Sequence, residues 1–273
     1  MFYRSIFAKL LTLTTRGITQ FPIPKPFRFF AFKVFAKTFG VNLDEAGKPL
    51  NKYNSFDAFF TRTLKPDSRP YKRQSNLILS PSDGKIQAYG KINKDSILQA
   101  KGVHYHLENL YPLDDFRQFI DGEFITIYLS PKDCHLIFSP VAGRVKSMCH
   151  VPGALYPVRE PYISKFKGLY TKNERVVTRL ETLFGPVAVI AVAALNVGNM
   201  TMAYDKTFST NYFHLKKRVV NYDRRIEVRQ ADHLASFHLG STVICLFPKN
   251  TIAWENLKLE QTIKYGETIA KVI

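Results

Sequence analysis

Three apolar segments constrain the fold of this chain, because each has the composition of a β-strand. Phe124 to Leu129 is β-branched and aromatic and lies between the turn signals Asp121-Gly122 and Ser130-Pro131. Pro186 to Ala194 and Thr242 to Phe247 are almost entirely apolar, as central strands of a sheet are. Strand patterns outnumber helix patterns, and the sequence shows neither a repeat of about 20–50 residues nor βαβ alternation. The sequence therefore predicts a β-rich α+β domain.

Two further elements are expected near the ends of this domain. Ser55 is a suitable N-cap for a short helix over residues 56–60. Ile263 to Ile273, with Tyr265-Gly266 in its middle, resembles a closing hairpin.

The first forty residues differ from the rest, because aromatic residues alternate there with Lys and Arg. The six Phe residues from Phe27 to Phe39 do not gather on one side of a helical wheel, whereas a helix packed on a core usually shows a cleaner stripe. Aromatic and basic helices of this kind lie in membrane surfaces. We expect residues 1–40 to be membrane-docking helices and residues 41–273 to be the main domain. Packing of the same helices on the core is the alternative.

The charge of the chain favours an anionic partner. Lys and Arg number 39 against 22 Asp and Glu, which gives a net charge of +17. Zinc-finger, helix-turn-helix and aromatic RNA-binding patterns are absent, so an anionic membrane is favoured over nucleic acid. No stretch has the roughly 18 uninterrupted apolar residues of a membrane span, and no secretory signal is convincing. We expect a peripheral membrane protein on the cytoplasmic side.

The three cysteines indicate neither disulfides nor a metal site. Cys134, Cys149 and Cys245 are odd in number and have no paired spacing. Free thiols suit a reducing compartment, and we expect all three to be small buried apolar residues. No metal is expected.

The Gly240-Ser241 bond, directly before the last apolar segment, is a candidate for backbone self-cleavage. Glycine leaves its carbonyl open to attack, and serine supplies the attacking hydroxyl. Attack on the Gly240 carbonyl turns the peptide into an ester. Elimination and hydrolysis then leave a pyruvoyl group in place of Ser241. The tripeptide alone is weak evidence, because most Gly-Ser-Thr sequences are ordinary turns before strands.

Further segments accompany this site in a fixed order along most of the chain. They are Phe59-Phe60-Thr61-Arg62 with Leu64-Lys65-Pro66 and Arg69-Pro70, Ser80-Pro81-Ser82-Asp83-Gly84, Leu98-Gln99-Ala100-Lys101-Gly102, Tyr128-Leu129-Ser130-Pro131-Lys132-Asp133-Cys134-His135, Val151-Pro152-Gly153-Ala154-Leu155, Asn173-Glu174-Arg175-Val176-Val177 and Asn196-Val197-Gly198. In these segments the chain resembles the phosphatidylserine decarboxylases, pyruvoyl-dependent proenzymes of the prokaryotic type.

The resemblance implies a fold, a reaction and a cofactor. It implies a single β-rich α+β domain of stacked antiparallel sheets with N-terminal helices. It implies a carboxy-lyase that converts phosphatidylserine in an anionic membrane to phosphatidylethanolamine. The cofactor would be a covalent pyruvoyl group derived from Ser241, after cleavage between Gly240 and Ser241 into chains 1–240 and 241–273. A homo-oligomer is left open.

The same resemblance assigns roles to two further residues. Asp83 matches the family's charge-relay aspartate, which orients a histidine during self-cleavage in the manner of a serine protease triad. His135 matches a histidine tied to substrate handling and proton transfer, for which imidazole is suited near neutral pH. From the residues alone, an aspartate that caps a turn and a structural histidine are the expected readings. Asp133 also matches the family's pattern, and a turn cap is again the reading from the residues alone.

One position departs from the family's pattern. The second histidine of its motif is replaced by Phe138, which cannot accept a proton. His135, or His238 three residues before Ser241, is then the candidate substitute base. A member of the lineage that binds anionic lipid without processing or catalysis is the alternative function.

Overall fold

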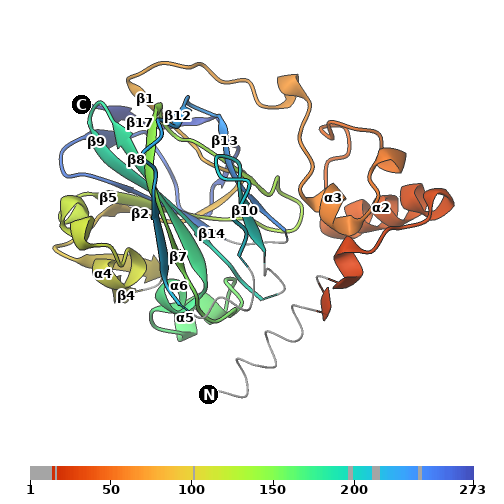
Figure 1. Ribbon diagram of the computed structural model, residues 1–273, viewed down its shortest axis with the longest axis horizontal. Coiled ribbons are helices and arrows are strands. Elements are labelled where there is room, and N and C mark those ends of the chain that lie inside the picture. Colours follow the sequence, from red (N-terminus) through yellow and green to blue (C-terminus); the bar gives the residue numbers. More distant parts are fainter. Residues whose placement is uncertain (1–13, 16, 101, 196–198, 211–215, 239–241) are drawn as a thin grey trace.

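The computed structural model describes residues 14–15, 17–100, 102–195, 199–210, 216–238 and 242–273 (Figure 1). Within these residues the largest sheet has nine strands, and all its pairings are antiparallel. In spatial order its strands are β11 (Arg218–Asn221), β7 (Gly143–Val151), β8 (Arg175–Thr182), β9 (Gly185–Val192), β14 (Thr242–Phe247), β5 (Glu123–Tyr128), β2 (Gly84–Lys91) and β16 (Thr262–Ile263), and β12 (Glu227–Val228) also pairs with β7.

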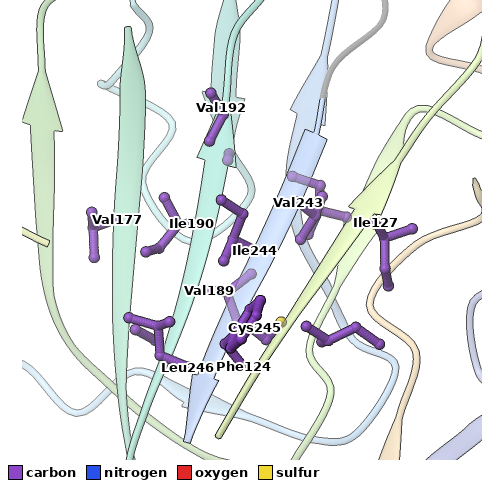
Figure 2. Packing of buried hydrophobic residues seen from close by; sticks show 14 of the residues in the cluster. Phe124, Ile127, Val177, Val189, Ile190, Val192, Val243, Ile244, Cys245 and Leu246 are labelled. Carbon is purple, nitrogen blue, oxygen red and sulfur yellow. The ribbon is translucent and has the colours of Figure 1, made fainter. Parts of the chain in front are cut away.

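Strand β14 lies at the centre of this sheet, between β5 and β9. All six of its residues are buried, and Thr242 pairs with Tyr128 on one side and Val192 on the other. Figure 2 shows Val243, Ile244, Cys245 and Leu246 packed among the apolar side chains of the neighbouring strands. The three predicted strands are therefore confirmed. Burying each Val, Leu, Ile or Phe side chain contributes about 1.5–3 kcal/mol, so the start of β14 is held firmly.

Smaller sheets complete the β-rich body among the described residues. One consists of β10 (Met200–Met202), β13 (His233–Phe237) and β6 (Leu136–Phe138). The others are β1 (Leu77–Leu79), β17 (Thr268–Val272) and β15 (Ile252–Trp254), and the pair β3 (Ser96–Ala100) and β4 (Val103–His106). This arrangement confirms the expected α+β class with antiparallel sheets.

The expected closing hairpin is wrong. The chain turns at Gly266, whose φ of 86° suits glycine, but the strands on either side of the turn do not pair with each other. β16 joins β2 in the large sheet, whereas β17 lies between β1 and β15. Partners distant in the sequence compete for these strands, and the local turn signal does not reveal them.

The helices whose two ends both lie in the described residues are short apart from the first of them. They are α2 (Lys25–Phe39), α3 (Phe56–Phe60), α4 (Leu107–Leu110), α5 (Tyr162–Lys165) and α6 (Leu169–Lys172), with 3₁₀ turns η1 (Leu50–Lys52), η2 (Pro66–Ser68) and η3 (Asp114–Phe119). Ser55 caps α3 as predicted, because its hydroxyl accepts a hydrogen bond from the amide of Ala58 at 3.1 Å. In Figure 1, α2 and α3 lie to one side of the β-rich body.

Helix α2 packs on α3 with one face and exposes the other. Phe32 and Ala36 are buried, and the Phe32 ring stacks on Phe59 with centroids 4.8 Å apart. Phe29 and Phe30, by contrast, are 55% and 71% exposed. None of the helices in the described ranges combines the length and the apolar character that crossing a membrane requires.

Candidate active site

The predicted cleavage site falls where the chain passes from one sheet to another. Gly240 and Ser241 themselves lie outside the described residues. Before them, β13 belongs to the three-stranded sheet with β6 and β10, and His238 donates its backbone N–H to Asn199 O at 3.0 Å. After them, Thr242 begins the central strand of the large sheet. Both flanks of the bond are therefore anchored by backbone hydrogen bonds.

His135 lies next to the chain that leads into this bond. It directly precedes β6, and its carbonyl oxygen accepts the amide of Phe237 at 2.9 Å. The side chain is completely buried, and its ring lies 4.1 Å from the ring of Phe60, centroid to centroid. Nε2 lies 3.1 Å from Ser130 O, so this nitrogen carries the hydrogen and donates it to the carbonyl.

The environment of His135 keeps the imidazole neutral. Burial, followed by the positive charge of Arg62, lowers its pKa to about 3. With Nε2 protonated, Nδ1 presents a lone pair, and this atom has no hydrogen-bond partner in the part of the chain that the structure describes. A buried polar atom without a partner is costly, so this nitrogen marks a place where a donor is expected.

Asp133 stabilises the turn before His135. Its Oδ2 accepts hydrogen bonds from both the amide and the hydroxyl of Ser130, each at 2.7 Å. This is the turn cap expected from the residues alone. The guanidinium of Arg62 donates a hydrogen bond from Nη2 to the carbonyl oxygen of Lys132 in this turn, at 2.9 Å. The bond connects the turn to the segment that follows α3.

Asp83 is buried immediately before β2, and its carboxylate is bound by protein donors. Arg69 donates to both carboxylate oxygens, with Nε 3.0 Å from Oδ1, and the amide of Tyr265 reaches Oδ1 at 2.9 Å. Arg69 also pairs with Glu45 at 2.8 Å, and these two carboxylates raise the pKa of its guanidinium although burial opposes the rise. Gly84 allows this placement, since a Cβ there would overlap the carbonyl of Tyr128.

Phe138 occupies its β6 position as an apolar, packed side chain. Its ring stacks on Tyr265, and it is only 9% exposed. Its backbone amide bonds to Pro81 O at 2.8 Å, which places β6 beside the loop that carries Asp83. The phenyl ring thus packs on Tyr265, whose amide binds Asp83, and it offers no proton acceptor.

His238 has a carboxylate partner that sequence reasoning missed. Its Nδ1 lies 2.8 Å from Oδ1 of Asp57, and its Nε2 lies 3.2 Å from the hydroxyl of Thr201. Asp57 is in the first turn of α3, 181 residues away along the chain. The capped helix was recognisable from Ser55, but nothing local indicated which residue its aspartate would meet.

A pocket of about 690 Å³ opens between α2 and the β-rich body. Aromatic and aliphatic side chains dominate its described lining, and Arg159 is the one charged residue among them. The pocket wall contacts His135 and Thr242, the residue after the predicted cleavage bond. Tyr128 in its wall pairs with Thr242, and Phe60 in its wall packs against His135. The lining residues are Thr15, Phe35, Phe39, Phe60, Tyr128, Leu129, Pro131, Pro157, Val158, Arg159, Tyr162, Ala194 and Leu195.

The cysteines are buried free thiols, as predicted. Burial raises the pKa of Cys134 to about 12 and also raises those of Cys149 and Cys245, so none is a thiolate at neutral pH.

Comparison with known proteins identifies the family. The phosphatidylserine decarboxylase family model matches residues 56–271. A phosphatidylserine decarboxylase proenzyme of Saccharophagus degradans is 38% identical over 242 residues, which cover 87% of this chain and 85% of that protein. One of Coxiella burnetii is 40% identical over 248 residues, 89% of this chain and 87% of that protein. One of Myxococcus xanthus is 34% identical over 256 residues, 93% and 91% respectively. The chain therefore belongs to the phosphatidylserine decarboxylase family and is an enzyme of the carboxy-lyase class.

Proposed function

We propose that this protein decarboxylates phosphatidylserine to phosphatidylethanolamine, with a pyruvoyl group that it makes from Ser241 by cleaving the Gly240-Ser241 bond. The observation that carries the proposal is the pocket. It is mainly apolar, contains a single arginine among its described lining residues, and adjoins both His135 and the strand that begins after Ser241. Such a lining suits an amphiphile with apolar chains and an anionic head group.

The residues present fit a pyruvoyl group. Its precursor, Ser241, follows a glycine in the sequence. The buried Nδ1 of His135 has no hydrogen-bond donor among the described residues, so it can accept one from a bound group. When present, the pyruvoyl carbonyl supplies the electron sink that decarboxylation of an amino acid requires. The neutral imidazole of His135 accepts a hydrogen bond at Nδ1, as from the substrate amine, while Ser130 fixes the ring through Nε2.

The pocket residues would hold and orient the lipid. Arg159 lies exposed at the pocket and pairs with an anionic phosphate or carboxylate of the head group. Phe35 and Phe39 of α2 line the pocket from the side of the aromatic helix, where acyl chains find apolar cover. Water is displaced from this lining when the lipid enters, which strengthens the ion pair with Arg159.

The exposed face of α2 provides a membrane-docking surface next to this pocket. We define the α2 docking face as Phe27, Phe29, Phe30 and Phe39 together with Lys25, Arg28, Lys33 and Lys37. All are exposed except Arg28, which is partly buried. Aromatic insertion and attraction of the cations to anionic lipid act together in such surfaces. This face supports a peripheral membrane location and a docking role for the α2 part of residues 1–40, and we propose the cytoplasmic side as its location.

Intact mass spectrometry together with a decarboxylation assay tests the proposal. Wild type should give chains of residues 1–240 and 241–273, the smaller with a blocked, carbonyl-bearing N-terminus, and should release carbon dioxide from phosphatidylserine in vesicles. Ser241→Ala should remain one inactive chain, because alanine has neither hydroxyl nor leaving group. Ser75→Ala, a substitution of the same kind at an exposed turn, should process normally. Decarboxylation by uncleaved Ser241→Ala, or an uncleaved wild type that binds vesicles without activity, would overturn the proposal.

A further inference from the structure

The His238–Asp57 pair has the geometry of a base and its orienting carboxylate. A carboxylate only accepts hydrogen bonds, so Nδ1 of His238 carries the hydrogen that bridges the 2.8 Å to Asp57. Nε2 then presents its lone pair and accepts the hydroxyl hydrogen of Thr201 at 3.2 Å. This is the tautomer in which the histidine of a serine protease triad takes a proton.

The His238–Asp57 pair is largely buried from solvent, and both residues lie in hydrogen-bonded backbone. The side chains of His238 and Asp57 are 17% and 16% exposed, so water weakens their attraction only in part. Asp57 lies in a helical turn capped by Ser55, and the backbone of His238 is bonded to Asn199. In the described residues, the ring's partners are Asp57 from α3 and the neutral Thr201 from β10.

The scissile bond is within reach of this ring by covalent distance alone. Ser241 lies three positions after His238 in the sequence, and three residues span at most about 10 Å of extended chain. The length of the intervening chain therefore permits contact between the imidazole of one residue and the hydroxyl of the other.

The other candidate groups are less suited to act as the base. Phe138 has no acceptor. His135 has a pKa of about 3, which makes its imidazole a weak base at neutral pH. Both oxygens of Asp83 are engaged by Arg69 and Tyr265.

We propose that His238 is the general base of self-cleavage and that Asp57, rather than Asp83, is the residue that positions it. Nε2 removes the Ser241 hydroxyl proton as Oγ bonds to the Gly240 carbonyl carbon. The imidazolium returns that proton to the nitrogen of residue 241 as the C–N bond breaks, which leaves an ester and a free amine. Loss of the Cα proton of residue 241 and of the Gly240 carboxylate gives dehydroalanine, and water converts this to the pyruvoyl group and ammonia. This inference rests on the self-cleavage proposed above.

The rival role for the pair is a structural tether. Asp57 belongs to the segment with α2 and α3, and His238 belongs to the β-rich body, so their hydrogen bond joins the two parts. A tether would contribute to stability and would not set the pH at which cleavage begins. The experiment therefore needs a readout besides the rate.

Cleavage is followed in full-length protein made by pulsed cell-free synthesis, by intact mass against time and pH. His238→Gln should slow cleavage by at least about 100-fold, the lower end of general-base contributions. Asp57→Asn keeps the shape and an acceptor for Nδ1 but removes the charge. It should slow cleavage about 10-fold and move the acid limb of the rate profile to lower pH, because the protonated imidazole loses its counter-charge. Asp57→Glu should recover most of the rate.

A matched control is available on the β3–β4 pair, where His106 Nδ1 lies 3.0 Å from Asp95 Oδ2 on the exposed surface. His106→Gln and Asp95→Asn should leave the rate and its pH profile unchanged. Wild-type rates in both His238→Gln and Asp57→Asn would overturn this inference while leaving self-cleavage intact. A slowed Asp57→Asn whose acid limb does not move would also overturn it in favour of the tether. If His238→Gln fails to fold, the rate and pH profile of Asp57→Asn decide the question, provided that its melting temperature equals that of the wild type. Wild-type protein that never cleaves would contradict the proposed function itself, because that function requires the pyruvoyl group.

Discussion

The ring of Phe138 stacks on the ring of Tyr265, with centroids 3.9 Å apart and planes 20° from parallel. The backbone amide of the same Tyr265 donates to Asp83, and the guanidinium of Arg69 lies over the Tyr265 ring. Phe138 is thus built into the cluster that holds Asp83. Phe138 therefore packs against Tyr265, which contacts both members of the buried Asp83–Arg69 ion pair.

Phe138→His should accelerate self-cleavage. An ionised carboxylate has about four acceptor positions, and within the described residues three donors bind Asp83, so it can still orient an imidazole at position 138. A flat ring also preserves the stacking on Tyr265. We expect at least a 10-fold faster time course by intact mass, toward the lower end of general-base effects. Phe138→Leu, which adds no base, is the control. Equal rates for the two variants would show that Asp83 no longer supports a triad.

His135 should make folding stability pH-dependent. Its pKa of about 3 in the folded protein lies below the unfolded value of 6.5, so between these values the unfolded chain binds a proton that the folded protein does not. The free energy of unfolding therefore rises with pH up to about 6.5. At pH 5 it is lower than at neutral pH by about 2 kcal/mol. Denaturant melts of uncleaved Ser241→Ala protein measure this.

When His135→Gln is added to this protein, the number of protons taken up on unfolding between pH 5 and 6.5 should fall by about one. The difference in slope between the two proteins should vanish from pH 7.5 to 8.5, where histidine is neutral in both states. Parallel slopes between pH 5 and 6.5 would contradict the neutral, buried state of this ring.

The α2 docking face should drive vesicle binding. Phe29 and Phe30 are exposed, whereas Phe32 and Ala36 are buried against α3, so substituting the exposed pair spares the packed face. Phe29→Ser with Phe30→Ser should weaken binding to anionic vesicles at least 10-fold in a sedimentation assay, because two large side chains no longer insert. Leu183→Ser, at a 99% exposed residue in the turn between β8 and β9, is the matched control. Unchanged binding by the Phe pair would leave α2 as a packing element alone.

Arg159→Gln should raise KM for phosphatidylserine with little change in kcat. The guanidinium contacts the head group equally before and during reaction, and a single ion pair at an open pocket is worth about a factor of 10. Lys165→Gln, on α5 but outside the pocket lining, is the control for general charge. A fall in kcat at constant KM would place Arg159 in the chemistry instead of in binding.

Much of the fold follows from local sequence. The apolar runs of β5, β9 and β14 are buried on both faces, and a strand of that composition has few alternatives to the middle of a sheet. The helix over 56–60 follows from its Ser55 cap. The final hairpin was mispredicted because a turn signal reports that the chain reverses and does not report which strands pair.

By itself the sequence determined the family, three strands of the large sheet and the place of Gly240-Ser241 directly before one of them. Those properties depend on residue types and short-range periodicity, which the chain carries locally. Only the tertiary structure decided the partners of the charged residues. Asp57 meets His238 across 181 residues, and Asp83 meets the amide of Tyr265 across 182. Such contacts form when distant strands and helices are packed together, so the chemistry available to His238 and Asp83 was settled by the fold.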